Sequence, residues 1–329
     1  MDNYKEMNDL SKDAVNRLAV GEAGVGQRVD NYLLRMLKGV PKSHIYRILR
    51  SGEVRLNRKR VKPDVRLALG DELRIPPIRT GSHATATPPT ARPIALSILY
   101  EDDALIAIDK PSGLAVHGGS GVAFGLIEQL RATRPEAKFL ELVHRLDRDT
   151  SGVLLVAKKR PALVGLHAAL RDGAVDKRYA VLVKGKWRDL KRTVELPLTK
   201  FLTGDGERRV RVEQGTGKHA RTVFLRQQVW ADVAQPVSLL EAELHTGRTH
   251  QIRVHLTHLG FPLAGDDKYG DFAWNKVLAK QGLKRMFLHA SRLEVTHPID
   301  ARTLIFQVPL PADLAAFIRR LDAPEASDA

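Results

Sequence analysis

The chain has 329 residues, of which 43% are hydrophobic, and this length and composition predict about two globular domains. It contains no cysteine, which excludes disulfides, thiolate catalysis and cysteine-ligated zinc or iron–sulfur sites. The formal net charge of +15 indicates a polyanionic partner, and the lack of a signal-like or 18-residue apolar segment predicts a cytoplasmic protein without membrane contact.

A basic segment is the first candidate domain, and we place it at residues 26–79, after a mobile tail formed by residues 1–25. Between Gln27 and Arg79 the sequence has 14 Lys and Arg residues against five Asp and Glu residues. Apolar residues at helical spacing predict two short helices, the second of which ends at Gly52. Two short strands joined by a basic turn follow, so this segment is expected to be a compact, positively charged module.

Basic side chains of the second helix and of the turn are the candidate contacts to phosphate. Arg47 and Arg50 lie three residues apart, opposite to the apolar positions, so they can meet phosphates while the other helix face packs. The alternative is an ordinary solvated helix face, although such faces usually mix charges of both signs. The candidate phosphate-binding residues of the module are Lys42, Arg47, Arg50, Arg58, Lys59 and Arg60.

The run PKSHIYRILRSGEV from Pro41 to Val54, with its two-helix and basic-turn surroundings, resembles the S4 RNA-binding domain. Charge alone does not distinguish RNA from DNA, so the expectation that the polyanion is RNA depends on this resemblance. Residues 80–93 are rich in Pro, Ser, Thr and Gly and lack hydrophobic periodicity, which predicts a flexible linker.

Residues 94–321 are predicted to form a second, larger domain of the α+β class, followed by a mobile C-terminal tail at 322–329. Its candidate strands outnumber its clear helices and do not alternate regularly with them, which favours a largely antiparallel sheet. The glycine-rich stretch 118–121 lacks the Gly-Lys-Ser/Thr of a P-loop and the spacing of a dinucleotide fingerprint. We therefore interpret it as a loop that leads into a helix.

The run HRLDRDTSG at 144–152 is the first candidate chemical segment. The five apolar residues that follow it, 153–157, are typical of a strand covered on both faces, and the Asp, Thr and Ser residues before them favour a tight turn. Asp147 is therefore expected to be held rigidly between Arg145 and Arg148, ionised and available for chemistry. The alternative is a salt-bridged turn ahead of a core strand.

The segment HTGRTHQIRVHLTHLG at 245–260 is predicted to be a turn followed by a helix, with Thr249 as its N-cap and Gly260 at its end. Arg253 has an apolar residue on either side, so it should be partly buried, and a buried arginine requires a carboxylate partner.

The histidines of this segment suggest a metal site only weakly. His245, His250 and His255 are five residues apart, which turns them away from one another around a helix. His255 and His258 could share a ligand, but no third partner is evident, and we expect no metal.

Successive motifs of the larger domain resemble those of the RluA-type pseudouridine synthases. The motifs are HRLDRDTSG at His144, KRYAVLVKG at Lys177, TGRTHQIRVH at Thr246 and FLHA at Phe287. With the S4-like module in front, the chain from about Gly26 to Leu321 resembles the RluC type, which acts on large-subunit (23S) ribosomal RNA. The resemblance implies a single eight-stranded, mixed and mostly antiparallel sheet with flanking helices and a cleft across it.

The same resemblance implies that the protein isomerises specific uridines to pseudouridine, without a cofactor, after flipping them out of the RNA. By position, Asp147 is the catalytic aspartate and Arg253 pairs with it, while Tyr179 stacks on the uracil and is a candidate base. Arg145 matches the arginine that enters the RNA helix where the uridine has left it. The apolar residues that match the pocket lining are Ile252 and Leu288.

The sequence leaves the target uridines open, and also whether Asp147 attacks C1′, attacks C6 or abstracts a 2′ proton. Two other classes remain at this point. A non-catalytic RNA-binding factor would explain the charge but leaves Asp147 without a role, and a metal-dependent nuclease could use Asp147 with Asp149. We expect a monomer whose partner is ribosomal RNA, with no obligate protein partner.

Overall fold

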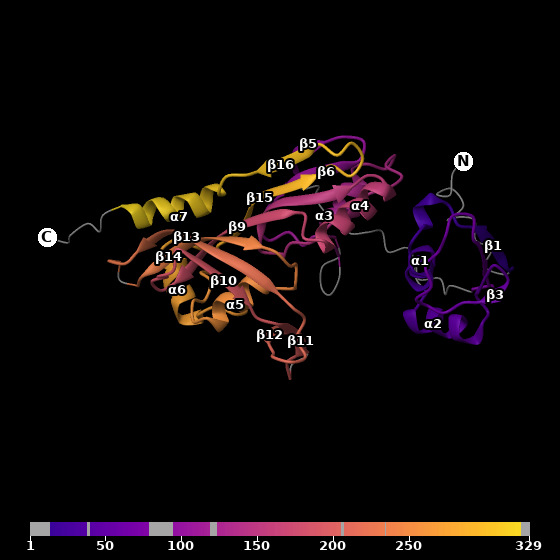
Figure 1. The fold of residues 1–329 in the computed structure, drawn as a ribbon, viewed down its shortest axis with the longest axis horizontal. Helices are drawn as coiled ribbons and strands as arrows, with labels where there is room; N and C mark the ends of the chain where they lie inside the picture. The colour runs from indigo at the N-terminus through magenta and orange to yellow at the C-terminus, as the bar shows by residue number, and fades with distance from the viewer. Residues whose placement is uncertain are drawn as a thin grey trace. The chain divides into compact units, whose positions relative to one another are not determined.

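The computed structural model describes residues 14–37, 40–78, 95–118, 124–204, 207–233 and 235–323. The chain divides into two compact units, residues 1–92 and 93–329 (Figure 1). The predicted linker 80–93 lies wholly outside the described ranges. Among the described residues, no helix has the length and apolar character needed to cross a membrane.

The smaller unit contains the two helices and the basic turn expected from the sequence. Its helices are α1 (Val29–Met36) and α2 (Lys42–Ser51), and its sheet has the order β1-β4-β2-β3. The strands are β1 (Asn16–Ala19), β2 (Arg55–Leu56), β3 (Lys59–Arg60) and β4 (Glu72–Ile75). Helix α2 ends at Gly52, whose positive φ of 77° is readily adopted by glycine. Asn57 and Arg58 also have positive φ, as in the two-residue turns that join tightly twisted strands.

The prediction of a mobile tail at residues 1–25 is wrong for its described part. Strand β1 pairs antiparallel with β4, with Leu18 opposite Leu73, and Val20 is buried in the core of the unit. The strand is only four residues long and two of them are polar, so its sequence pattern is weak and its pairing with β4 stabilises it. Similarly, Asp322 belongs to the last helix rather than to the C-terminal tail, and its carboxylate accepts a hydrogen bond from Trp230 Nε1.

The larger unit is built on one mixed sheet with the strand order β10-β13-β14-β9-β15-β8-β6-β5 (Figure 1). Two more strands, β16 beside β15 and β7 beside β8, extend the expected eight strands to ten. Among the described strands of this sheet, β15 and β8 form the one parallel pair. The strands are β5 (Ser97–Glu101), β6 (Leu105–Lys110), β7 (Glu141–Leu142), β8 (Ser151–Ala157), β9 (Asp176–Lys184), β10 (Lys191–Glu195), β13 (Arg221–Trp230), β14 (Val237–Leu244), β15 (Leu288–Thr296) and β16 (Thr303–Gln307).

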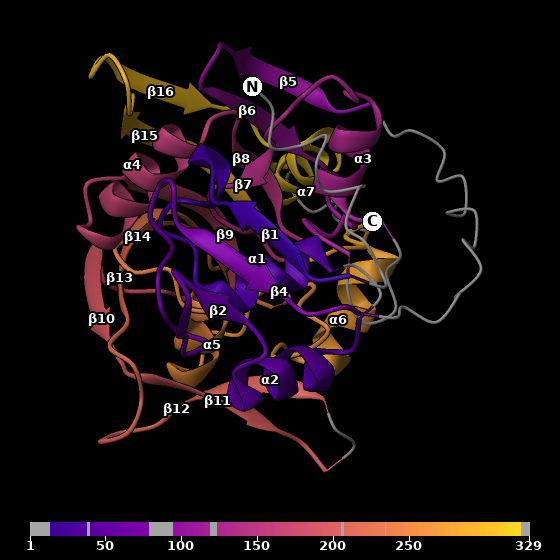
Figure 2. The ribbon, with the colours of Figure 1, turned by 90° about the vertical axis from the view of Figure 1, so that its right-hand side faces the viewer.

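Helices flank this sheet, and a two-stranded ribbon projects from it (Figures 1 and 2). The helices are α3 (Leu126–Ala132), α4 (Arg160–Arg171), α5 (Gln251–His258), α6 (Phe272–Lys280) and α7 (Ala312–Asp322). The ribbon pairs β11 (Leu198–Leu202) with β12 (Arg208–Val212), and β12 lies beside α5. Helix α3 follows Gly125, as expected for the end of the glycine-rich loop, of which residues 119–123 fall outside the described ranges.

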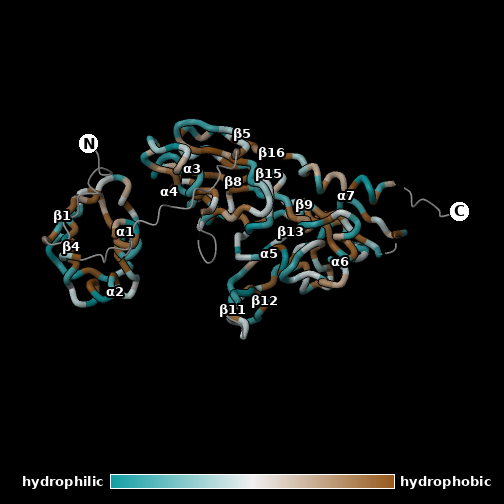
Figure 3. The backbone as a smooth tube through the Cα atoms, turned by 180° about the vertical axis from the view of Figure 1, so that it is seen from behind, coloured by the Kyte–Doolittle hydropathy of each residue, from teal (hydrophilic) through white to brown (hydrophobic). Residues whose placement is uncertain are grey.

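The centre of the sheet is covered on both faces. Every residue of β8 is buried, which confirms the strand predicted from its continuous apolar run. Leu154 and Val156 belong to one apolar cluster, while Val153 and Leu155 belong to another that includes residues of α4. The apolar colour in Figure 3 accordingly follows β8.

A close approach between β8 and β15 positions the chemical segment 144–152. Gly152 has a φ of +111°, and a Cβ atom there would lie 2.2 Å from the carbonyl oxygen of Ala290. Only glycine therefore permits the start of β8 to run alongside β15. The turn that carries Asp147 is consequently fixed next to Leu288 and Tyr179, which lie on the adjoining strands.

Candidate active site

One pocket collects all six residues that the sequence analysis assigned to the catalytic site. Asp147 and Arg145 come from the turn before β8, Tyr179 from β9, and Leu288 from the start of β15. The remaining two, Ile252 and Arg253, come from the first turn of α5. Segments more than 100 residues apart in sequence therefore meet at one end of the central strands.

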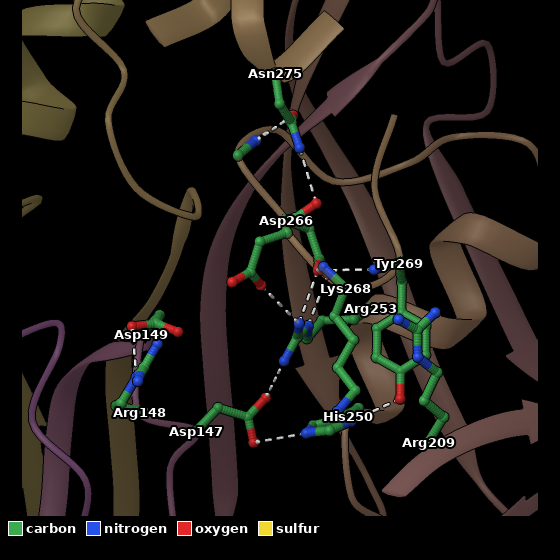
Figure 4. Close-up of polar contacts among 12 residues, drawn as sticks. Asp147, Arg148, Asp149, Arg209, His250, Arg253, Asp266, Lys268, Tyr269 and Asn275 are labelled. Atoms are coloured by element: carbon green, nitrogen blue, oxygen red, sulfur yellow. Dashed lines mark hydrogen bonds and ion pairs between the residues drawn. The ribbon is translucent and has the colours of Figure 1, made fainter. Parts of the chain in front are cut away.

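Asp147 and Asp266 share Arg253 (Figure 4). Arg253 Nη1 donates to Asp147 Oδ2 at 3.0 Å, and its Nε and Nη2 each donate to one oxygen of Asp266 at 2.7 Å. The Asp266 side chain is fully buried, whereas that of Asp147 is 21% exposed. The bidentate pair with Asp266 therefore fixes the guanidinium, and an N–H group on Nη1 holds the carboxylate that faces the pocket.

Electrostatics keep the buried pair charged. Burial alone would raise the pKa of Asp266, but hydrogen bonds and charge from Arg253 lower it below its ordinary value. Burial likewise opposes the charge on Arg253, and the carboxylates of Asp266 and Asp147 more than offset it, so its pKa is raised. The same cationic guanidinium is the ion-pair partner of Asp147, at 3.0 Å from its Oδ2.

The neighbouring arginines are not the partners of Asp147, contrary to the sequence prediction. Arg148 Nε lies 3.3 Å from Asp149 Oδ1, and its side chain is largely exposed. Arg145 is exposed at the pocket, and no ion pair of this residue occurs within the described ranges. Successive side chains of a turn point in different directions, so adjacency in sequence does not place them on the same carboxylate.

Tyr179 supplies an aromatic wall beside Asp147. Its side chain is almost completely buried, and burial, with a contribution from the negative charge of Asp147, raises its pKa. The phenol is therefore neutral at physiological pH. Ile252 and Leu288, both buried, form apolar walls of the same pocket. A flat ring and two aliphatic side chains next to a carboxylate suit a planar, weakly polar group such as a nucleobase.

Backbone contacts hold the turn that carries Asp147. Lys110 is completely buried, and its Nζ donates to the carbonyl oxygens of Pro111, Leu114 and Arg148 at 2.8–3.0 Å. Ser112 Oγ donates to the Asp149 carbonyl at 2.8 Å. The carbonyls on the C-terminal side of Asp147 are thus tied to the end of β6, which gives the rigidity expected from the sequence.

The sequence analysis missed three residues of the site, Asp266, His250 and Tyr269. It required a carboxylate for Arg253 but considered only Asp147. The run Gly265-Asp266-Asp267-Lys268-Tyr269-Gly270, an acidic pair enclosed by glycines, marks a turn and was the available signal. His250 was considered only as a metal ligand.

The start of α5 differs from the prediction, because its N-cap is His250 rather than Thr249. His250 has left-handed backbone angles, with φ of 53°, and makes no side-chain cap hydrogen bond. The Gln251 side chain instead folds back, and its Oε1 accepts from Thr246 Oγ1 and the Arg248 amide. Gly260 follows the helix with a φ of +81°, consistent with its predicted role at the helix end.

The histidine pair at the end of α5 does not form a metal site. The ring nitrogens of His255 contact Thr222 Oγ1 at 3.1 Å and the Leu196 carbonyl at 3.0 Å. Within the described ranges there is no group of three His, Cys, Asp or Glu residues that could hold a metal ion.

The basic residues predicted in the smaller unit lie on α2 and on the β2–β3 hairpin. Arg47, Arg50, Arg58, Lys59 and Arg60 are exposed, while the Lys42 side chain is outside the described part of the structure. Arg60 donates to the Ser51 carbonyl at 2.9 Å and Arg50 to the Tyr46 carbonyl at 3.3 Å. These bonds hold the two side chains against α2 and leave their charge at the surface.

The chain matches the models of two families and several curated proteins. Residues 104–258 match the RNA pseudouridylate synthase family, and residues 27–73 match the S4 domain. The chain is 51% identical over 303 residues to ribosomal large subunit pseudouridine synthase C of Salmonella typhimurium, covering 90% of this chain and 93% of that protein. Identity to the protein of the same name from Escherichia coli K12 is 49%, over 94% and 97% of the two chains. The chain belongs to the pseudouridine synthase family.

Solved structures of pseudouridine synthases show the same fold. Human RNA pseudouridylate synthase domain containing 1 aligns with a TM-score of 0.54 and 26% identity, over 70% of this chain and 95% of the human one. These findings confirm the predicted α+β fold class and the prediction of an RNA pseudouridine synthase, an isomerase. The two other classes, a non-catalytic RNA-binding factor and a metal-dependent nuclease, are thereby set aside.

Proposed function

We propose that this synthase converts specific uridines of large-subunit (23S) ribosomal RNA to pseudouridine, with Asp147 as its catalytic carboxylate. The carrying observation is the pocket in which Arg253 holds Asp147 beside the ring of Tyr179. The choice of RNA is supported by the S4 domain and by curated relatives at about half identity, whose names specify the large ribosomal subunit. Its expected setting is the cytoplasm, where it acts as a monomer without an obligate protein partner.

The reaction needs groups that the pocket contains. The bond between N1 of uracil and C1′ of ribose breaks, the base turns, and C5 bonds to C1′, after which C5 loses its proton. Atoms and electrons balance without an oxidant or a transferred group, so the chemistry requires no cofactor. Asp147 supplies the anion that acts on the nucleotide, at C1′, at C6 or at the 2′ proton.

Tyr179 holds the uracil through its ring in this scheme. The detached base must remain in the pocket while it turns, and stacking on an aromatic ring with aliphatic side chains around it permits rotation in the plane of the base. The proton at C5 is removed by Tyr179 or by water. Because burial and Asp147 raise the pKa of the phenol, Tyr179 acts as a base only if it gives up its own proton as it accepts that of C5.

The uridine has to leave the RNA stack before it can reach Asp147. Extrusion costs a few kcal/mol, and stacking on Tyr179 offsets part of that cost. Arg145, exposed at the mouth of the pocket, is placed to occupy the position that the uridine vacates. Phosphates of the surrounding RNA bind to basic residues of the S4 domain, which are Lys42 and the exposed Arg47, Arg50, Arg58, Lys59 and Arg60.

The test compares Asp147→Asn with Asp149→Asn. The first substitution keeps the size of the side chain but removes its charge and nucleophilicity, so pseudouridine formation in an unmodified 23S ribosomal RNA transcript should be lost. The second changes Asp149, the half-buried partner of Arg148, and should retain activity. Activity is measured in EDTA by tritium release from RNA labelled at C5 of uridine, and the modified sites are mapped by sequencing.

Filter binding serves as the control for RNA affinity, which should be nearly the same for both variants and the wild type. Loss of an essential nucleophile or base lowers the rate at least about a hundredfold. Asp147→Asn with more than about 1% of the wild-type rate would therefore contradict the role of this carboxylate. Absence of pseudouridine in RNA treated with the wild-type protein would contradict the choice of substrate.

A further inference from the structure

The two oxygens of Asp147 have different surroundings (Figure 4). Oδ2 accepts a hydrogen bond from Arg253 Nη1 at 3.0 Å. Oδ1 lies 3.8 Å from His250 Nε2, which is beyond hydrogen-bond distance, and both side chains line the pocket. A small movement of either side chain would bring Nε2 into contact with the oxygen that Arg253 leaves free.

The other nitrogen of the His250 ring has a defined partner. Nδ1 lies 2.8 Å from the hydroxyl oxygen of Tyr269, and that oxygen accepts a hydrogen bond from the backbone amide of Val210 at 2.9 Å. The amide can only donate, so the Tyr269 proton is available for Nδ1. The reverse arrangement, with Nδ1 as donor, leaves the hydroxyl proton without an acceptor among the described residues.

A hydrogen bond from Tyr269 to Nδ1 determines the tautomer of the ring. When Nδ1 accepts, the proton of a neutral imidazole is on Nε2, where it points toward Asp147. Burial lowers the pKa of His250, and the nearby cations Arg253 and Lys268 lower it further, whereas Asp147 and Asp266 raise it. The ring is therefore a neutral N–H donor at pH 7.

The backbone of His250 supports a functional placement. Its φ of 53° lies in the left-handed region, which is unfavourable for a residue with a side chain. The conformation does not serve to cap α5, because the side chain makes no cap hydrogen bond. It directs the ring to Tyr269 and Asp147 instead.

One turn of the chain holds both groups that face Asp147. The Asp266 carboxylate binds Arg253 and accepts the amides of Lys268 and Tyr269 at 2.8 and 3.0 Å. Three residues later, Tyr269 contacts His250 edge to face, with ring centroids 5.4 Å apart, and lies against the Arg253 guanidinium. The turn therefore sets the guanidinium and the imidazole relative to each other.

We propose that His250 is a positioning residue for Asp147, with Tyr269 holding its ring in the tautomer that carries the proton on Nε2. When RNA fills the pocket, Nε2 approaches Oδ1, and the carboxylate is held from both sides. Each carboxylate oxygen has two lone pairs, so Oδ1 keeps one for the nucleotide. This inference assumes the proposed role of Asp147 in uridine isomerisation, but the state of the His250 ring can be tested without that assumption.

Kinetic measurements test whether His250 Nε2 donates a hydrogen bond to Asp147. His250→Phe keeps a ring of similar size without an N–H group, and the single-turnover rate of tritium release from a 23S ribosomal RNA transcript should fall about 10- to 100-fold, as for a lost hydrogen bond to a charged group. His250→Gln, whose side-chain amide can reach the position of Nε2, should recover at least about a third of the rate. Tyr269→Phe should also slow the reaction. His258→Phe, on the exposed end of α5, is the control and should leave the rate unchanged.

RNA affinity and thermal unfolding are recorded for each variant, because a positioning role predicts a change in rate at unchanged affinity. Equal losses in His250→Phe and His250→Gln would overturn the donor role, because a restored N–H donor would then recover none of the rate. A wild-type rate in His250→Phe would overturn the proposal altogether.

Nuclear magnetic resonance tests the ring directly. The full chain is labelled with nitrogen-15 in histidine, and long-range proton–nitrogen spectra are recorded. The His250 signal is assigned as the one lost in His250→Gln. It should show that the ring carries its proton on Nε2. Tyr269→Phe should shift the ring toward a mixture of tautomers. A proton on Nδ1 in the wild type would refute the inference even if the enzyme is active. The expected tautomer in a protein without isomerase activity would instead place the error in the proposed function.

Discussion

Removing the Arg253 side chain should cost the catalytic unit both activity and stability. In Arg253→Ala, the fully buried Asp266 carboxylate loses both of its guanidinium hydrogen bonds and keeps only the amides of Lys268 and Tyr269. Breaking a buried pair by removing one partner typically costs about 3–5 kcal/mol. For a domain of this size that corresponds to a melting temperature lower by about 6–20 °C.

The loss of stability in Arg253→Ala should be larger at neutral pH than at acidic pH. In the wild type the pKa of Asp266 is lowered, so its contribution to stability is present above the ordinary carboxyl pKa and is lost as the pH falls through the folded value. In Arg253→Ala burial remains without the arginine, so the pKa of Asp266 is raised and the carboxylate destabilises the fold at neutral pH. The difference in melting temperature should thus be largest near pH 7 and shrink toward pH 4.

Differential scanning calorimetry measures the melting temperatures and their dependence on pH. It is applied to the wild type, Arg253→Ala and the double variant Arg253→Ala/Asp266→Asn. The asparagine keeps an oxygen for the two backbone amides but carries no charge. The double variant should therefore be more stable than Arg253→Ala by at least about 1 kcal/mol at pH 7. If Arg253→Ala melts at the wild-type temperature, or if its loss grows on acidification, the reasoning about the buried pair is incorrect.

Three further predictions follow from the site and the S4 domain. Tyr179→Ala should weaken RNA binding by about 1–3 kcal/mol through lost base stacking, whereas Tyr179→Phe should bind normally in the same titration. Lys110→Met should leave three backbone carbonyls without a donor, lowering unfolding free energy by about 1–3 kcal/mol and slowing isomerisation. The double variant Arg58→Ala/Lys59→Ala should reduce the slope of log affinity against log salt by about 1.5, while Lys280→Ala on α6 should leave it unchanged.

Local patterns were sufficient to predict several elements of the fold. The apolar run of β8 and the helix that ends at Gly52 depend on neighbouring residues, so their sequences specify them directly. The pairing of β1 with β4 is different, because its residues contact a strand more than 50 positions away. The N-cap of α5 also escaped prediction, because His250 takes this position with left-handed backbone angles, which the sequence around Thr249 did not indicate.

The candidate site shows a similar contrast between local and long-range features. Motif resemblance indicated Asp147, Tyr179 and Arg253 as site residues, and the apolar neighbours of Arg253 indicated that it needs a carboxylate. The sequence could not show that Arg253 has two such partners, because Asp266 reaches it through a turn held by the Asn275 side chain on α6. Nor could it show that Asp147 and His250 approach each other, since this contact depends on how α5 packs against the sheet.

The position of β15 has a consequence for how the enzyme is made. This strand lies between β9 and β8 although it is the last but one of the sheet in chain order. A nascent chain emerges from its N-terminus onward, so the carboxylate turn and the tyrosine strand are both synthesised before the strand that aligns them. No fragment that stops short of residue 288 can assemble the pocket, and the long-range pairings make folding slow. Activity therefore begins only after nearly the whole polypeptide has been translated, which prevents incomplete chains from modifying the RNA of the ribosome that synthesises them.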